Sequence, residues 1–291
     1  MTILVLGSAG NLGTALTEYG AEREDLKLIG WDKTDIDVSD QVLLSKKIIE
    51  LKPEVIINTV AFNDVDACET SEDARTLANQ LNVELVATLA DIALEINATL
   101  IHYSSDYVFK GDSEIGYSET DEADPLSVYG ETKLNGEKEI ISASGKGLQW
   151  YLIRTSKLFG PKGMSVGAKP SFFELMFRLS NTNPSLKLVN DEIGSFTYSR
   201  DLAAATIALI DDNAAFGIYH LINAGETSWH DAAKYFFETL GKQIILEPVG
   251  AESFPRPAKR PKHSLLLNTK RPPLRTWQEA VSDYCNKETF I

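Results

Sequence analysis

Ile3-Leu4-Val5-Leu6-Gly7-Ser8-Ala9-Gly10-Asn11-Leu12-Gly13 is the stretch that decides the fold we expect. Its four apolar residues predict a short buried strand, and its glycines, in the order G-x-x-G-x-x-G, predict a tight turn into a helix. Glycine lets backbone N–H groups approach a pyrophosphate closely, and the N-terminus of the following helix stabilises the negative charge. The stretch therefore predicts a dinucleotide-binding turn at the start of a parallel sheet.

A charged pair follows the next predicted strand, roughly twenty residues after the glycine turn. Asp32 is placed to accept hydrogen bonds from the adenosine ribose hydroxyls of a bound dinucleotide. Lys33, beside it, would instead favour the 2′-phosphate of NADP, unless it is an ordinary solvated surface lysine. The sequence therefore leaves both NAD and NADP open as cofactors.

Short apolar runs rich in β-branched residues alternate with segments of helical period through the first half of the chain. This alternation is typical of βαβ units around a parallel sheet, and continuous apolar character suits strands covered on both faces. We predict strands at Ile3–Leu6, Lys27–Trp31, Val55–Val60, Thr99–Ser104 and Trp150–Arg154, and helices at Asn11–Tyr19, Ser39–Leu51, Glu72–Glu95 (capped by Ser71) and Val128–Ile141. The expected fold class is α/β, with a Rossmann-type doubly wound parallel sheet.

The second half of the chain has shorter elements separated by Gly, Pro and Asn, which predict a smaller C-terminal α/β lobe. A helix at Ser199–Ile210, capped at its first residue, and a strand at Gly217–Ile222 are expected to return to the main sheet. We therefore expect residues 1–156, with return elements near 199–222, to bind NAD(P), and residues 157–291 to bind mainly the substrate.

The chain of 291 residues carries a formal charge of −14, which disfavours bulk attraction to nucleic acid or to an anionic membrane. Residues 1–140 hold 28 acids and 10 bases, whereas residues 141–291 hold 14 acids and 18 bases. The reversal is strongest in residues 255–275, which contain five prolines, seven Lys or Arg and no acid. This composition predicts an extended segment over a surface rather than a helix.

The cysteines, the first residues and the histidines indicate where the protein is expected to act and what it is expected to bind. Cys68 and Cys285 form no disulfide framework, and the apolar start lacks the basic lead of a signal peptide. We therefore expect a cytoplasmic protein, a monomer or homodimer, with neither nucleic acid nor membrane as a partner. The four histidines show no ligand spacing, so no metal site is expected.

Tyr129-Gly130-Glu131-Thr132-Lys133 places a phenol and an ammonium on one face of a predicted helix, since residues four apart are neighbours there. A free tyrosine has a pKa of about 10, so acid–base chemistry at neutral pH needs a shift of about three units, roughly 4 kcal/mol. A neighbouring lysine charge and a cationic nicotinamide would supply this shift. The pattern alone is usually a surface helix pair. Here, however, Ser104-Ser105-Asp106-Tyr107 lies at a predicted strand end, where a serine hydroxyl would hydrogen-bond a substrate carbonyl.

The glycine turn, the strand-end serine and the Tyr129–Lys133 pair follow one another along the chain. In this order they resemble the extended short-chain dehydrogenase/reductase superfamily, and more closely the dTDP-4-dehydrorhamnose reductase family. The resemblance runs from about residue 2 to residue 285 and is most specific over residues 102–137. The stretches that carry it are His102-Tyr103-Ser104-Ser105-Asp106-Tyr107-Val108-Phe109, Glu119-Thr120-Asp121, Pro125-Leu126-Ser127-Val128-Tyr129-Gly130-Glu131-Thr132-Lys133-Leu134-Asn135-Gly136-Glu137, Ile153-Arg154-Thr155-Ser156, Asn190-Asp191-Glu192-Ile193-Gly194, Gly217-Ile218-Tyr219-His220-Leu221 and Arg260-Pro261-Lys262-His263-Ser264.

The resemblance implies a reaction and a set of site residues. Hydride would pass from NAD(P)H to C4 of a nucleotide-linked 4-keto-6-deoxy sugar, with dTDP-4-dehydro-L-rhamnose as the expected substrate and dTDP-L-rhamnose as the product. Tyr129 would be the catalytic acid, Lys133 would bind the nicotinamide ribose and lower the tyrosine pKa, and Ser105 stands where the family has Ser or Thr. The cofactor would contact Gly7, Gly10, Asn11, Leu12, Gly13, Asp32, Lys33, Asp37, Val38, Val60, Ala61, Phe62, Asn63, Tyr129 and Lys133. The substrate would contact Ser105, Asp106, Tyr107, Lys157, Asn190 and Arg260, with Arg260 beside its pyrophosphate.

Two features depart from the family pattern, and both fall on substrate recognition. Lys157 stands where the family usually has a Trp that packs on the sugar, and residues 160–171 form a longer loop, which we expect to border the substrate. A magnesium site known in some family members is not carried over, because position 15 here is Ala.

Two other functions stay open on the sequence. One is an epimerase or dehydratase of nucleotide sugars, although dehydratases commonly have an Asp-Glu pair after the strand-end residue and here Tyr107 follows Asp106. The other is a non-catalytic NADP-binding subunit that resembles the regulatory β subunit of methionine adenosyltransferase. Lys157 in place of Trp is compatible with that function.

Overall fold

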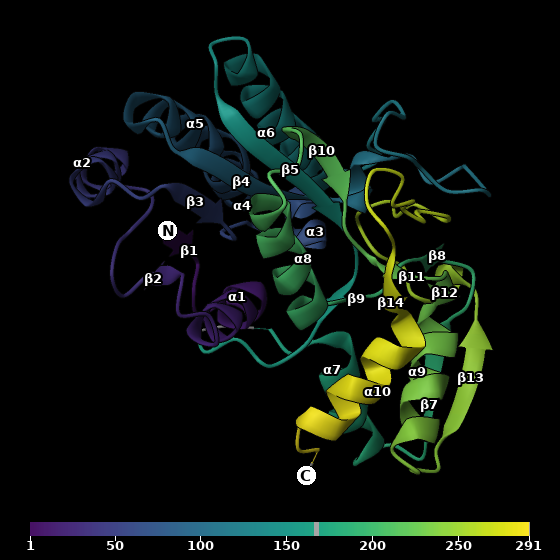
Figure 1. Cartoon of the computed structure of the whole chain (residues 1–291). Helices are drawn as coiled ribbons and strands as arrows, with labels where there is room; N and C mark the ends of the chain where they lie inside the picture. The colour runs from purple at the N-terminus through teal and green to yellow at the C-terminus, as the bar shows by residue number, and fades with distance from the viewer. Residues whose placement is uncertain (166–168, 291) are drawn as a thin grey trace.

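A parallel sheet lies at the centre of the larger part of the molecule (Figure 1). The computed structural model describes residues 1–165 and 169–290, and within them this sheet has six strands in the order β10-β5-β4-β3-β1-β2. Every neighbouring pair in it is parallel. The strands are β1 (Thr2–Leu6), β2 (Lys27–Trp31), β3 (Val55–Asn58), β4 (Thr99–Ser105), β5 (Gln149–Thr155) and β10 (Gly217–His220). The expected Rossmann-type doubly wound sheet is confirmed, and so is the return of the late strand, which pairs with β5.

Helices cover both faces of the central sheet (Figure 1). One face carries α1 (Asn11–Ala21) and α8 (Ser199–Asp211), which pack against each other. The other face carries α2 (Gln41–Leu51), α5 (Leu85–Ile96) and α6 (Val128–Ser144). With both faces covered, the sheet is buried from two sides, as its sequence pattern predicts.

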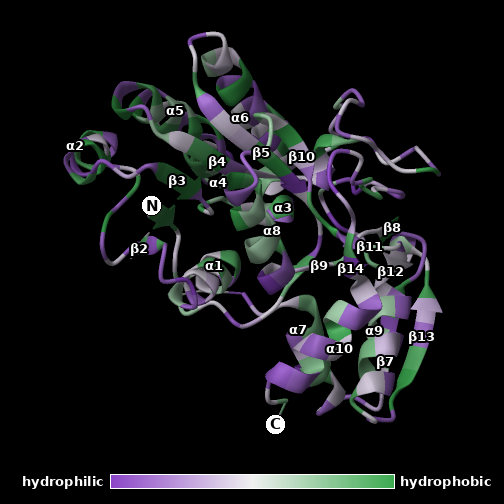
Figure 2. Ribbon diagram, viewed as in Figure 1, coloured by the Kyte–Doolittle hydropathy of each residue, from purple (hydrophilic) through white to green (hydrophobic). Residues whose placement is uncertain are grey.

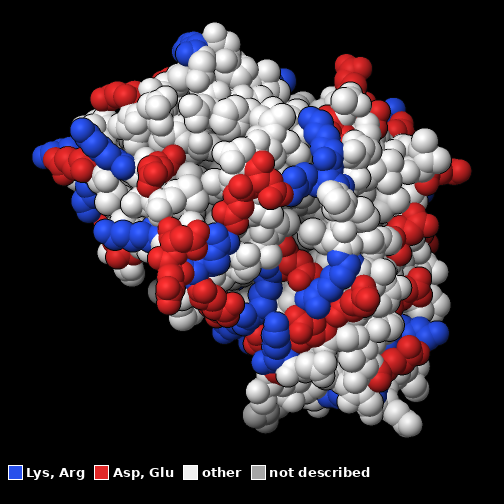
Figure 3. All heavy atoms as spheres, viewed as in Figure 1, with Lys and Arg blue, Asp and Glu red and all other residues white. Residues whose placement is uncertain are grey.

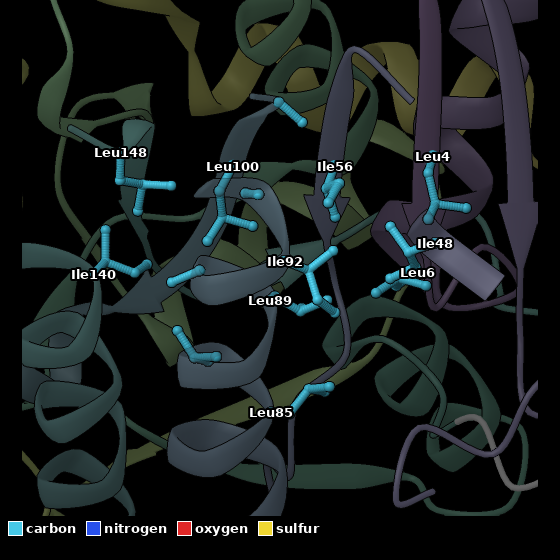
Figure 4. Close-up of a cluster of buried hydrophobic side chains, with 14 of the residues drawn as sticks. Leu4, Leu6, Ile48, Ile56, Leu85, Leu89, Ile92, Leu100, Ile140 and Leu148 are labelled. Carbon is cyan, nitrogen blue, oxygen red and sulfur yellow. The ribbon is translucent and has the colours of Figure 1, made fainter. Parts of the chain in front are cut away.

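Alternate residues of β1 point into two different cores, because successive side chains of a strand lie on opposite faces. Ile3 and Val5 belong to the core under α1 and α8, whereas Leu4 and Leu6 belong to the core under α2, α5 and α6. Figure 4 shows the second core, in which Leu4, Leu6 and Ile56 lie toward the side chains of α5. The apolar colour of β1 and β3 in Figure 2 reflects this burial on both faces.

The predicted helix over Glu72–Glu95 is interrupted in the structure. A π-helical turn, Gln80–Glu84, separates α4 (Glu72–Asn79) from α5, and a further helix, α3 (Val65–Thr70), precedes α4. Ser71 caps α4 as predicted, because its hydroxyl accepts a hydrogen bond from the N–H of Ala74 at 3.2 Å.

The prediction that Ser199 caps α8 was wrong. The helix begins one residue earlier than the prediction assumed, so that Tyr198 is the N-cap and Ser199 is the first helical residue. The hydroxyl of Ser199 has no hydrogen-bond partner among the described residues. It lies instead against Gly160, where a Cβ atom would collide with it.

A smaller lobe follows β5 and has its own core, which is rich in aromatic side chains (Figure 1). Helices α7 and α9 pack on the parallel pair of strands β7 and β13, and the remaining short strands form separate two-stranded pairs. The helices are α7 (Phe172–Ser180), α9 (Trp229–Thr239) and α10 (Trp277–Lys287). The strands are β6 (Leu158–Phe159), β7 (Ser185–Val189), β8 (Ile193–Gly194), β9 (Thr197–Tyr198), β11 (Asn223–Ala224), β12 (Thr227–Ser228), β13 (Ile245–Val249) and β14 (Leu274–Thr276).

The basic segment 255–275 is non-helical, as its prolines predict. It runs beside the loop after β4, with bridges from His263 to Asp112 and from Leu266 to Tyr117. Arg260 anchors it to α3, since its guanidinium forms hydrogen bonds of 2.9 and 2.7 Å to the carboxylate of Asp66. On the face shown in Figure 3, acidic and basic side chains are interspersed rather than gathered into one basic surface.

Candidate active site

A cleft of about 620 Å³ opens where the strands of the central sheet reach their carboxyl ends. The strand order reverses between β1 and β3, and ligands of open parallel sheets bind at such a switch point. The predicted residues that line the cleft are Gly7, Gly10, Asn11, Leu12, Asp32, Lys33, Val60, Ala61, Asn63, Ser105, Tyr129, Lys133 and Lys157. The structure therefore brings the glycine turn, the charged pair after β2 and the Ser-Tyr-Lys set into one cavity.

The other predicted residues lie outside this lining: Gly13, Asp37, Val38, Phe62, Asp106, Tyr107, Asn190 and Arg260. Gly13 supports the turn, because a Cβ there would collide with the carbonyl of Gly7 and α1 could not pack so closely. The carboxylate of Asp37 accepts a hydrogen bond from the N–H of Ser39, at 3.0 Å. Phe62 and Tyr107 pack in the apolar cluster that contains Tyr129. Phe62 and Tyr107 therefore support Tyr129 without lining the cleft.

Sequence reasoning missed part of the lining, namely Thr59, Tyr103, Ser104, Thr155, Ser156, Leu158, Gly163, Ser165 and Lys169. Thr59 directly follows β3, Thr155 is the last residue of β5, and Ser156 follows it. They could have been found by marking the residues at the carboxyl end of every predicted parallel strand. Gly163, Ser165 and Lys169 come from the loop 160–171, which stood out by its length, although no motif singled out these three residues.

The described part of the loop 160–171 lies against the glycine turn and contributes Gly163, Ser165 and Lys169 to the lining of the cleft. That the loop borders the substrate stays a prediction. Asn11 Nδ2 donates to the carbonyl of Pro161 at 2.5 Å, and the N–H of Ser165 donates to the carbonyl of Ala9 at 3.0 Å. These hydrogen bonds hold residues 160–165 over the turn. Residues 166–168 of the same loop lie outside the described residues.

Helix α6 presents both Tyr129 and Lys133 to the cleft, as their spacing predicts. Lys133 Nζ donates to the carbonyl of Tyr103 at 2.7 Å and lies 3.5 Å from His102 Nε2. Burial lowers the pKa of Lys133 to about 8, and the nearby Glu137 carboxylate opposes that shift. Burial raises the pKa of Tyr129, while a hydrogen bond with the Ser105 side chain lowers it. The phenol is therefore held in the neutral form, which can donate a proton.

Asp106 orients Ser105 rather than facing the cleft itself. Ser105 Oγ donates to Asp106 Oδ1 at 3.0 Å and accepts from the N–H of Tyr107 at 3.2 Å. The second oxygen of Asp106 accepts from Ser264 at 2.6 Å. Burial raises the pKa of Asp106, and the hydrogen bond from Ser264 opposes the shift. Each oxygen of the Asp106 side chain thus accepts a hydrogen bond from a serine, and the hydroxyl of Ser105 is fixed at the strand end.

Two buried polar contacts fix α6 relative to the rest of the site. Arg154 of β5 donates to both oxygens of Glu137 at 2.9 and 2.6 Å. Asn82, in the π-helical turn, donates at 3.0 Å both to Thr132 Oγ1 and to the carbonyl of Phe62. The π turn therefore connects α6 to the loop that follows β3, an arrangement in keeping with the frequent occurrence of π turns at functional sites.

Neither a metal-binding cluster nor a membrane-spanning helix is found in the described part of the chain. No group of three or more His, Cys, Asp or Glu side chains within residues 1–165 and 169–290 has an arrangement that would hold a metal ion. None of the helices in the same residues is long and apolar enough to cross a membrane.

Comparison with known proteins gives the family. The family model described as RmlD substrate binding domain matches residues 1–290. The dTDP-4-dehydrorhamnose reductase of Escherichia coli (strain K12) is 34% identical over 284 residues, which cover 93% of this chain and 90% of that protein. This chain belongs to the dTDP-4-dehydrorhamnose reductase family. The resemblance noted in the sequence is thereby confirmed.

Solved structures of the family share the whole architecture. A dTDP-4-dehydrorhamnose reductase from Clostridium acetobutylicum is 33% identical, with a TM-score of 0.88 over 98% of this chain and 99% of that chain. The enzyme from Bacillus anthracis, solved in complex with NADP, is 29% identical, with a TM-score of 0.89 over 99% of both chains. Because these relatives are named as reductases, the alternative of a non-catalytic subunit is not favoured.

Proposed function

We propose that the chain is an NAD(P)H-dependent reductase of the C4 carbonyl of a dTDP-linked 4-keto-6-deoxy sugar. The substrate would be dTDP-4-dehydro-L-rhamnose and the product dTDP-L-rhamnose. The observation that carries this proposal is that Ser105, Tyr129 and Lys133 line the same cleft as the glycine turn. The names of the similar proteins support the choice of substrate.

The residues at the switch point fit a dinucleotide. Gly7 has a φ of +77°, which favours glycine, and it lies beside the N-terminus of α1, where N–H groups point outward. Asn11 Oδ1, also in this turn, is buried without a hydrogen-bond partner among the described residues. We assign Gly7, Gly10, Asn11 and Leu12 to the pyrophosphate, and the pair Asp32 and Lys33 to the adenosine ribose. A bound NAD(P)H supplies the hydride for C4.

The residues of the chain then handle the proton. Tyr129, neutral because it is buried, donates its proton to the C4 oxygen as negative charge develops there. Lys133 stabilises the phenolate that is left, since its ammonium is on the same helical face. Ser105, fixed by Asp106, lines the same cleft and would position the C4 carbonyl by a hydrogen bond. Such a positioned acid contributes about 10²- to 10⁴-fold to the rate.

The larger part of the molecule would bind the cofactor and the smaller lobe the sugar nucleotide. We assign residues 1–156, with the return elements near 199–222, to the cofactor, and residues 157–291 mainly to the substrate. Arg260 would border the diphosphate of the substrate, from the position where Asp66 holds it. The protein would act as a monomer or a homodimer in the cytoplasm.

Steady-state turnover tests this function. The purified protein is mixed with NADPH or NADH and a dTDP-4-keto-6-deoxy sugar, with a 3,5-epimerase present, and loss of the reduced cofactor is followed. We expect net oxidation of the cofactor in proportion to the dTDP-L-rhamnose formed. An epimerase or dehydratase returns its hydride to the product and would consume no cofactor. A non-catalytic subunit would bind NADP without turnover. Either of these results would reject the proposal.

A further inference from the structure

A second buried lysine, Lys157, is among the residues that line the cleft containing the reacting groups. It stands two residues after the end of β5, at the edge of the sheet where ligands bind. Its backbone has a φ of +40°, in the left-handed region that non-glycine residues rarely adopt. Backbone held in such a conformation is concentrated at active sites and ligand contacts.

The ammonium group of Lys157 is buried and makes no hydrogen bond to any residue in the part of the chain that the structure describes. It lies 4.8 Å from the ring centroid of Trp229 and 5.3 Å from that of Phe196. Gly194 makes room for it, since a Cβ there would be only 3.1 Å from Nζ. The two aromatic rings stabilise the positive charge but accept none of its three N–H groups in the way that oxygen does.

The electrostatic surroundings keep a proton on Lys157 at neutral pH. Burial lowers the pKa of Lys157 to about 8, while the nearby carboxylates of Asp106 and Glu192 raise it. Asp106 accepts hydrogen bonds from Ser105 and Ser264, and none from Lys157. Burying an ammonium group without hydrogen-bond acceptors costs free energy. An oxygen of a ligand in the cleft would supply the missing acceptor and offset that cost.

We propose that Lys157 is a specificity-determining residue, whose ammonium donates hydrogen bonds to an oxygen of the bound sugar nucleotide. The first choice for that oxygen is a hydroxyl of the hexose ring, because Lys157 and the Ser105–Tyr129 pair line one cavity from different elements. A non-bridging oxygen of the diphosphate has the same acceptor chemistry. This inference rests on the proposed reductase function and adds the chemical feature that selects the sugar.

Lys157→Met keeps the length of the side chain and removes its charge and its donors. We expect it to lower kcat/KM for the dTDP-4-keto sugar about 10- to 100-fold, the range for loss of a hydrogen bond to a charged group. The affinity for NADPH, measured by fluorescence titration, should stay within about twofold of the wild type, which also shows that the variant folds. Lys157→Gln, which retains two donors, should recover part of the loss, and the exposed control Lys146→Met should match the wild type.

Two further measurements identify the acceptor. With 2-deoxy and 3-deoxy analogues of the substrate, Lys157→Met should lose little on the analogue that lacks the contacted hydroxyl. Calorimetric titration with dTDP alone should give equal affinities if the acceptor is a ring hydroxyl, and a weaker affinity in the variant if it is the diphosphate. Either pattern supports the proposal.

The proposal is overturned by any of three results. The first is an unchanged kcat/KM for the sugar nucleotide in Lys157→Met. The second is a loss that falls on NADPH affinity instead. The third is a loss that persists on both deoxy analogues while dTDP affinity is unchanged. The wild type is assayed first, so absence of its turnover would reject the reductase function itself, and turnover with an unaffected variant would reject only the role of Lys157.

Discussion

Arg154 and Glu137 form a buried ion pair in which the guanidinium donates to both carboxylate oxygens, at 2.9 and 2.6 Å. Their side chains are only 4% and 1% exposed. The pair joins β5 to α6 one helical turn beyond Lys133, so it fixes the helix that carries the acid and the lysine of the proposed mechanism. Because both charges are out of water, each depends on the other for compensation.

Breaking this pair should destabilise the fold. We expect Glu137→Gln to lower the free energy of unfolding by about 3–5 kcal/mol, because it leaves the Arg154 charge buried and uncompensated. Urea denaturation followed by circular dichroism measures the change. The double variant Glu137→Leu/Arg154→Met should be more stable than Glu137→Gln, since it removes both charges. The exposed pair Lys46 and Glu50 is the control, and Glu50→Gln should change stability by no more than about 0.5 kcal/mol. A Glu137→Gln variant as stable as Glu50→Gln would contradict this account.

Removing the phenolic hydroxyl of Tyr129 should affect chemistry and not binding. We expect Tyr129→Phe to lower kcat by about 10²- to 10⁴-fold, the contribution of a positioned acid. The dissociation constant for NADPH should change by less than about threefold, because the ring still packs edge-to-face on Tyr107, as in the structure. Stopped-flow turnover and fluorescence titration separate the two quantities. A variant that retains wild-type kcat would rule out Tyr129 as the acid.

Lys33 should decide between the two nicotinamide cofactors. It lines the cleft beside Asp32, at the end of β2 where the adenosine ribose would lie. If its ammonium binds a 2′-phosphate, Lys33→Met should raise the KM for NADPH about 10-fold or more and leave the KM for NADH nearly unchanged. Steady-state kinetics with both cofactors gives the comparison. Equal changes in the two KM values would show that Lys33 is a solvated surface lysine.

The buried lysines should make the stability of the unliganded protein depend on alkaline pH. Burial lowers the pKa of Lys133 to about 8 from its ordinary value of 10.5, so between these values the unfolded chain binds more protons than the folded one. The free energy of unfolding attributable to Lys133 therefore rises with pH through this window, by up to about 1.36 kcal/mol per pH unit. Lys157 contributes in the same direction, because its pKa is also lowered to about 8.

The difference between the wild type and Lys133→Met isolates this contribution from other groups. We expect the stability advantage of the variant to shrink as the pH rises from about 8 to 10, in urea denaturation at closely spaced pH values. A difference that stays constant over this range would show that the Lys133 pKa is not lowered.

Those elements that depend on short-range patterns of residues could be predicted from the sequence. The sheet strands follow from runs such as Val55-Ile56-Ile57, and Ser105, Tyr129 and Lys133 line the cleft as predicted. Asp106 and Tyr107, predicted beside Ser105, do not line it. Parallel strands end at one edge, so knowledge of the strands alone brings Ser105 and Gly7 together. The extended segment 255–275 was also predictable, because proline excludes a helix.

The features that were missed depend on contacts between distant parts of the chain. The π turn at Gln80–Glu84 interrupts a regular apolar period, and the contacts of Asn82 there are with residues that lie far away in sequence. The position of the loop 160–165 depends on its hydrogen bonds to the glycine turn, and no periodicity encodes those. Local pattern cannot supply such tertiary partners.

Transfer of an isotopic label tests the central claim most directly. The protein is incubated with NADPH that carries deuterium at the transferable C4 position of the nicotinamide, together with dTDP-4-dehydro-L-rhamnose, and the product is examined by NMR and mass spectrometry. The account predicts one deuterium per product molecule, located at C4 of the sugar, and at least about 100-fold less labelled product from Tyr129→Phe over the same time. Absence of deuterium from C4 in the wild-type product would contradict it.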